Sequence, residues 1–292
     1  PMVLFWWIWT LGLFGILASQ TRATRSRLLL AVTILIGITC LRTWLMPLER
    51  HIFAGHEAEY LRLFLGEMLP NAGDTASYPT MQIWWWIWGQ VFAFWPQSPL
   101  WISSAVGVAS LLLADDALQS IFQLKRDRWI RQLWLFSFPL HWMWSLSAYN
   151  VIIPFFFVSL AFWLLARRRS EWVIGAALAL AVSTRMEMII ALLPFLYWKV
   201  ARDGWATRVL WMLLLPSISL LAMMSATIPG EGERWLALRI NWRLLVYHSP
   251  YHLLWPIVLL GAWLSRKTHL QWTLGALFLV SLNHVVMATF DD

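Results

Sequence analysis

The stretch that decides the fold is residues 2–46, MVLFWWIWTLGLFGILASQTRATRSRLLLAVTILIGITCLRTWLM. It holds two apolar runs, residues 2–18 and 28–46, each close to the roughly 20 residues with which a helix crosses a bilayer. Only basic charges lie between them, at Arg22, Arg25 and Arg27. By the positive-inside rule, the sequence predicts two transmembrane helices with a cytoplasmic connection.

The composition of the whole chain agrees with this interpretation. Of 292 residues, 60% are hydrophobic and 13% are charged, whereas a soluble domain carries about 25% charged residues. The 24 tryptophans against 6 tyrosines also suit the edges of a bilayer. The net charge of +7 comes from short basic clusters between apolar runs, so it predicts topology and excludes a nucleic-acid partner. Cys40 is the single cysteine, which excludes an intramolecular disulfide.

Further spans are predicted wherever apolar runs recur, at residues 100–122, 132–147, 151–166, a close pair within 172–198, 209–227, 252–265 and 272–290. We therefore expect an all-α polytopic transmembrane helix bundle of about ten spans, forming one domain over residues 1–292. The expected location is a bacterial inner membrane. Because the chain begins at Pro1 and ends at Asp292 directly after an apolar run, we expect it to be part of a longer translation product.

The later basic clusters set two conditions on this count. Residues 81–95, MQIWWWIWGQVFAFW, must not cross, because a crossing would put the cluster that begins at Lys125 outside. We interpret this segment as interfacial or re-entrant. Residues 172–198 must enter and return as two short helices around STRMEM, and Asp115 and Asp116 are expected at the cytoplasmic interface.

Two amphipathic segments are expected on the outer side. The first lies in the acidic outer loop, residues 47–99, where EAEYLRLFLGEML predicts a juxtamembrane helix after the second span. Its register puts Glu57, Leu61, Phe64, Leu65 and Met68 on one helical face and Glu59 on the other side. The second is residues 228–251, where Arg239 and Arg243 lie beside a stripe of tryptophan and leucine.

Four sequence segments follow one another in an order that is similar to that of a known class of membrane proteins. GHEAEYLRLFLGE is followed by YPTMQIWWWIWGQVFAF, by SLSAYN and by LAVSTRMEM. From about residue 28 to residue 292, the chain resembles the GT-C class of integral-membrane glycosyltransferases, whose first outer loop carries a DEAEYL-like string. The resemblance implies transfer of a sugar from a polyprenyl phosphate to an acceptor on the outer face. We expect no metal and no cofactor.

The resemblance also implies the site residues. Glu57 matches the Glu of the family's acidic pair, and His56 replaces its Asp, so these two are the candidate catalytic groups. A histidine in that place either accepts a proton near neutral pH or signals lost activity. The implied substrate contacts are Tyr60, Tyr149, Asn150, Arg185 and Glu187. At the second outer turn, Tyr149 and Asn150 stand where the family often has a charged residue.

Several alternatives remain open from the residues alone. Glu57 and Glu59 are equally well explained as solvated charges on an interfacial helix, and Arg185 with Glu187 as a structural ion pair. His248 and His252 flank Pro250, which prevents the single helix that a metal site would need.

Donor binding has its own physical rationale. A site for an anionic lipid head group needs fixed cations beside an apolar groove, and Arg239, Arg243 and Arg42 would supply the cations. The alternative is that these arginines only extend to the head groups of the surrounding lipid.

Three functions compete. The first is an active transferase that uses a polyprenyl-phosphate-linked sugar and membrane lipid. The second is an inactive GT-C-like structural subunit that assembles with other membrane proteins. The third, a transporter, would need polar residues along several spans, whereas here they concentrate in loops and hairpin tips.

Overall fold

The computed structural model describes residues 2–18, 36–37, 40, 56–70, 78–95, 98–122, 152–185, 188–189, 192, 196, 199–200 and 207–224. Within these ranges the protein forms seven helices and no strand. The helices are α1 (Met2–Ala18), α3 (His56–Phe64), α4 (Pro79–Phe92), α5 (Ser98–Phe122), α8 (Ile152–Ala166), α9 (Glu171–Thr184) and α11 (Thr207–Met224). The all-α fold class is therefore confirmed for the described part of the chain.

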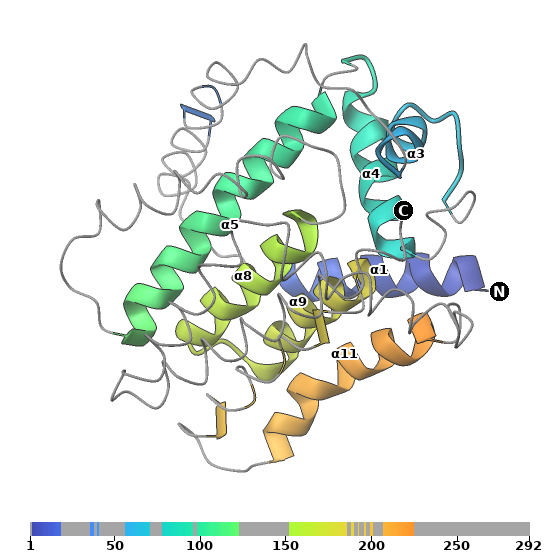
Figure 1. The fold of residues 1–292 in the computed structure, drawn as a ribbon. Helices are drawn as coiled ribbons and strands as arrows, with labels where there is room; N and C mark the ends of the chain where they lie inside the picture. The colour runs from blue at the N-terminus through green and yellow to red at the C-terminus, as the bar shows by residue number, and fades with distance from the viewer. Residues whose placement is uncertain are drawn as a thin grey trace, which may run out of the picture.

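Four of the helices lie side by side in chain order. α5 packs against α8, α8 against α9, and α9 against α11, as Figure 1 shows. α1 and α4 also contact α9, and they contact each other. The short helix α3 lies on α4, at the edge of this arrangement. α9 is thus the central helix, and every residue from Val173 to Thr184 is buried.

Helix length bears directly on the predicted spans. Among the described residues, one helix, α5 over Ser98–Ser120, is long and apolar enough to cross a bilayer. α1, α8, α9 and α11 are also apolar but shorter. α4 has 14 residues, close to the 15 of α8, so helix length does not test the expectation that residues 81–95 do not cross. The count of about ten spans is not established by these helices.

Most described helices begin and end near the predicted residues, with two exceptions. α3 ends at Phe64, five residues before the predicted end at residue 69, and α11 runs from Thr207 to Met224 instead of over 209–227. α1 and α8 cover residues 2–18 and 152–166, and α5 begins two residues before the predicted residue 100. α9 ends at Thr184, inside the predicted hairpin tip. The predicted spans 132–147, 252–265 and 272–290 lie outside the described residues, as do the segment 228–251 and almost all of 28–46.

The core is dominated by aromatic side chains from separate helices. Trp84 of α4 lies edge-on to Phe157 of α8 with ring centres 5.9 Å apart, and Phe14 of α1 lies 6.0 Å from Phe157. Two polar contacts join helices in this region. The hydroxyls of Thr10 and Thr80 lie 3.1 Å apart, and Trp9 Nε1 donates to Ser219 Oγ at 2.8 Å. Such contacts satisfy polar groups that packing removes from water.

Candidate functional site

The candidate catalytic helix α3 is fixed to α4 by direct backbone contact. A Cβ atom at Gly89 of α4 would lie 2.0 Å from the carbonyl oxygen of Phe64, so only glycine allows this approach. Tyr60, Leu63 and Phe64 are buried on the side of α3 that meets the core. The sequence thereby places α3 rigidly, although it has only nine residues.

A tight C-terminal cap ends α3. The backbone N–H of Glu67 donates to the carbonyl of Arg62 at 2.9 Å, and that of Gly66 donates to Leu63 at 3.2 Å. This hydrogen-bond pair is a Schellman motif, and Gly66 occupies its left-handed position with φ of 76°. The chain is therefore turned away immediately after the candidate helix.

His56 and Glu57 open α3, and their positions follow from helical register. His56 is four residues before Tyr60 and Glu57 is three residues before it. Residues at these spacings share a helix face, so both backbone positions fall on the side that carries the buried Tyr60. Glu59, which we expected to face solvent, is half-buried. By helical register alone, the backbone position of His56 lies as near to the face of Tyr60 as that of Glu57 does.

Arg185 is a predicted charged site residue that the structure describes as deeply buried. It directly follows α9, where the backbone becomes extended with φ of −159°, and only 1% of the residue is exposed. The N–H of Met188 donates to the Arg185 carbonyl at 3.0 Å, so the chain turns here, as the STRMEM pattern predicts. A guanidinium at such depth stays charged and is costly to desolvate, which is typical of paired or functional positions.

The remaining predicted site residues lie outside the described part of the chain. They are Arg42, Tyr149, Asn150, Glu187, Arg239 and Arg243. The structure accordingly brings together the first turn of α3 and Tyr60, and it places Arg185 at the end of the central helix.

Two buried donors on α4 were not anticipated from the sequence. The indole N–H groups of Trp84 and Trp85 are buried, and neither has a hydrogen-bond partner among the described residues. A buried unpaired donor is costly, so these groups are candidates to donate to a bound ligand. The WWW run at residues 84–86 was the visible signal, but we interpreted it only as an interfacial anchor.

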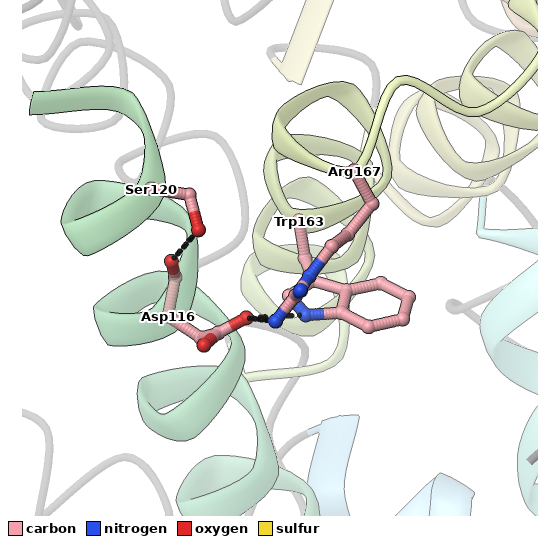
Figure 2. Close-up of polar contacts among 4 residues, drawn as sticks. All are labelled: Asp116, Ser120, Trp163 and Arg167. Atoms are coloured by element: carbon pink, nitrogen blue, oxygen red, sulfur yellow. Dashed lines mark hydrogen bonds and ion pairs between the residues drawn. The ribbon is translucent and has the colours of Figure 1, made fainter. Parts of the chain in front are cut away.

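The other end of α5 and α8 carries a polar cluster, shown in Figure 2. Asp116 of α5 accepts hydrogen bonds from Trp163 Nε1 at 2.9 Å and from Arg167 Nη2 at 2.5 Å. Ser120 Oγ donates to the Asp116 carbonyl at 2.8 Å. This cluster ties α5 to α8, and it supplies a structural role for the Asp116 carboxylate that the sequence could not assign.

A second ion pair involves the first residue of α9. Lys199 Nζ lies 2.7 Å from Glu171 Oε1, and both side chains are largely buried. Burial raises the pKa of Glu171, but the hydrogen bonds from Lys199 and the backbone, with the charges of Lys199 and Arg208, outweigh it. The net result is a pKa below the ordinary value of 4.5.

This pair predicts a loss of stability in acid. Because the pKa of Glu171 is lower in the folded state, its contribution is complete above pH 4.5 and is lost as pH falls through the folded-state pKa. Glu171→Gln should lower the unfolding free energy at neutral pH by about 1–2 kcal/mol and flatten the acid dependence. Thermal unfolding of the purified chain across this pH range measures both effects, and an unchanged acid slope in the variant would contradict the assignment.

The described part of the chain is all-helical, with the short helix α3 packed closely on α4 at its edge and a buried arginine at the end of its central helix. In the described ranges, no group of three metal-binding side chains occurs. Comparisons with family models, with curated proteins and with solved structures give no match to this chain.

Proposed function

We propose that the chain is an integral-membrane glycosyltransferase that moves a sugar from a polyprenyl phosphate to an acceptor on the outer face of the membrane. Glu57 is the catalytic carboxylate in this proposal, and His56 is its neighbour. The observation that carries the proposal is the backbone contact between Gly89 and Phe64, which holds α3 in one place. A general base needs such fixed positioning relative to the proton it accepts.

The substitution of His56 for the family's aspartate is compatible with this chemistry. A neutral imidazole accepts a proton near pH 7, and a carboxylate one residue away favours the protonated form that follows. Both residues lie in the first turn of α3, where the helix dipole stabilises the negative charge of Glu57. In this proposal either Glu57 or His56 accepts the proton taken from the acceptor.

The donor side of the proposal uses cations and apolar surface. Arg239, Arg243 and Arg42 would hold the lipid phosphate, and Arg185 would contact the sugar or its phosphate. The indole N–H groups of Trp84 and Trp85 are further donors for sugar hydroxyls. In this proposal Tyr60, Tyr149, Asn150 and Glu187 complete the substrate contacts.

The membrane location is part of the same proposal. It comprises a bundle of about ten spans in a bacterial inner membrane, with α3 and α4 on the outer side. The supporting observations are the length of α5 and an exposed apolar stripe on α1, formed by Leu4, Ile8 and Leu11. A contiguous exposed apolar stripe marks a surface for contact with protein or membrane, and lipid tails are as apolar as leucine side chains.

A second candidate is an inactive subunit of a larger membrane assembly. It is favoured by His56 in place of an acid and by the neutral Tyr149 and Asn150 at the second outer turn. The two candidates are separated by incubating the purified full chain with a labelled polyprenyl-phosphate sugar and a broad set of acceptors. Transfer supports the enzyme, whereas absence of transfer together with stoichiometric co-purification of other membrane subunits supports the structural role.

A further inference from the structure

An arginine occupies a backbone position that normally requires glycine. At the end of α8, the N–H of Arg169 donates to Leu164 at 3.0 Å and that of Arg168 to Leu165 at 3.1 Å. This is the same Schellman motif that ends α3, where Gly66 takes the left-handed position. Here Arg168 takes it with φ of 55°, at a cost of about 1–2 kcal/mol for a residue with a Cβ atom. A strained residue that persists in this way points to a function of its side chain.

The charge balance around Arg168 leaves an excess of positive charge. Arg167 is bound to Asp116, and Lys199 is bound to Glu171. Arg168 and Arg169 are exposed, and no carboxylate pairs with either of them in the part of the chain that the structure describes. Two cations are therefore presented to the surroundings at the end of α8.

Exposed tryptophans lie close to these cations. Trp172, on the first turn of α9, stacks on Trp211 of α11 with ring centres 4.8 Å apart. The two residues are 40% and 45% exposed. Arg208, one turn before Trp211, is also exposed and acts electrostatically on Glu171, which places it at the same end of the molecule.

The exposed face of α11 continues from this point as apolar surface. Leu210, Leu214 and Leu221 follow one another at helical spacing, and each is at least 40% exposed. Along α11 the exposed residues therefore begin with Arg208, continue with Leu210 and Trp211 within one turn, and end with Leu214 and Leu221. This change from a charged to an apolar surface follows the order in which a helix meets lipid head groups, the membrane interface and acyl chains.

We propose that this end of α8, α9 and α11 binds an anionic phospholipid. Arg168 and Arg169 contact the head-group phosphate, with Arg208 beside them. Trp172 and Trp211 lie at the level of the glycerol backbone, and the acyl chains run along the leucine stripe of α11. The inference rests on the proposed membrane location, but it requires no sugar transfer, because the surface is separate from α3.

The test measures which lipid the full chain retains. The protein is reconstituted with equal amounts of phosphatidylcholine and phosphatidylglycerol and extracted in mild detergent, and the bound lipid is identified by mass spectrometry. Wild-type protein should retain phosphatidylglycerol preferentially. The double substitution Arg168→Gln with Arg169→Gln should reduce this preference about 25-fold, or about fivefold for each arginine near an anionic surface.

Three further variants separate binding from structure. Arg62→Gln, at an exposed arginine of α3, should leave the lipid preference unchanged. Replacement of Arg168 and Arg169 by lysine should retain most of it, because the charge remains. Arg168→Gly should raise thermal stability, since glycine accepts the left-handed conformation, and should still weaken the lipid preference. An arginine with only a capping role would change stability alone.

Two results would overturn the proposal. One is an equal ratio of the two lipids on the wild-type protein and on the Arg168→Gln, Arg169→Gln variant. The other is retention of inorganic phosphate by the detergent-solubilised chain without any lipid preference, which would identify a site for a soluble anion. A chain that lacks transfer activity but shows the predicted lipid preference would remove the proposed function and leave this inference intact.

Discussion

Glu57→Gln is expected to lower the rate of sugar transfer by about 10²–10⁴-fold while the protein still folds and inserts. The substitution removes the carboxylate but keeps the volume of the side chain. The α3 helix should remain in place, because Phe64 contacts Gly89 and Trp85 of α4, and Tyr60 and Leu63 are buried beside it. The measurement is single-turnover transfer from a labelled polyprenyl-phosphate sugar, made with equal amounts of folded protein.

The matched control for this change is Glu67→Gln. Glu67 is an exposed carboxylate that follows the same helix, and the proposed chemistry gives it no role. The Glu67→Gln variant should therefore transfer sugar at the wild-type rate. Equal rates for wild type, Glu57→Gln and Glu67→Gln would exclude Glu57 as the acceptor-side base, and a large loss only in His56→Ala would move that role to the imidazole.

Gly89→Ala is expected to destabilise the protein by about 1–3 kcal/mol or more, because an added methyl group meets backbone atoms that cannot rotate away. The new Cβ atom would lie 2.0 Å from the Phe64 carbonyl oxygen and 2.7 Å from its carbon, so α3 has to shift. Transfer activity should fall with stability, since the shift moves His56 and Glu57. The midpoint of thermal unfolding and the transfer rate are measured on the same preparation.

Two glycines serve as controls for this prediction. A Cβ atom at Gly12 of α1 would have no described atom within 4 Å, so Gly12→Ala should be neutral or stabilising by up to about 1 kcal/mol. At Gly175 of α9 the Cβ atom would lie 2.8 Å from the Met212 carbonyl oxygen, so Gly175→Ala should destabilise the α9–α11 contact. Its effect on activity should be smaller than that of Gly89→Ala at equal loss of stability, because the strain falls between α9 and α11 and not on α3. Wild-type stability for Gly89→Ala would contradict the close packing.

The helices could be predicted because each one is formed by a continuous stretch of sequence with a recognisable apolar pattern. The apolar runs at residues 2–18 and 151–166 match α1 and α8 to within one residue, and Arg185 marks the break after α9. Helix partners could not be predicted in this way. The contact of Gly89 with Phe64 and the bonds from Trp163 and Arg167 to Asp116 join residues far apart in the chain. The spacing of apolar residues within one helix does not show which residue of another helix will contact it.

The candidate site was predictable only as far as local pattern reaches. The string HEAEYL indicated a helix with one buried face, but the predicted face was only partly right. Phe64 is buried as expected, Leu61, Leu65 and Met68 are half-buried, and the structure also buries Tyr60 and Leu63. We expected Glu59 to face solvent, on the side of the helix opposite to Glu57. This expectation was wrong for Glu59, which is half-buried. The left-handed conformation of Arg168 could not be foreseen, since sequence rules assign that position to glycine.

The central claim is that the protein spans a membrane, with α3 on the outer side and the arginines that follow α8 on the inner side. The most direct test uses Cys40→Ser as background and introduces Glu67→Cys or Ser170→Cys, both at exposed positions. A membrane-impermeant thiol reagent is then applied to intact cells and to lysed cells. We predict that Glu67→Cys reacts in intact cells and that Ser170→Cys reacts only after lysis. Reaction of both positions from the same side would contradict the claim.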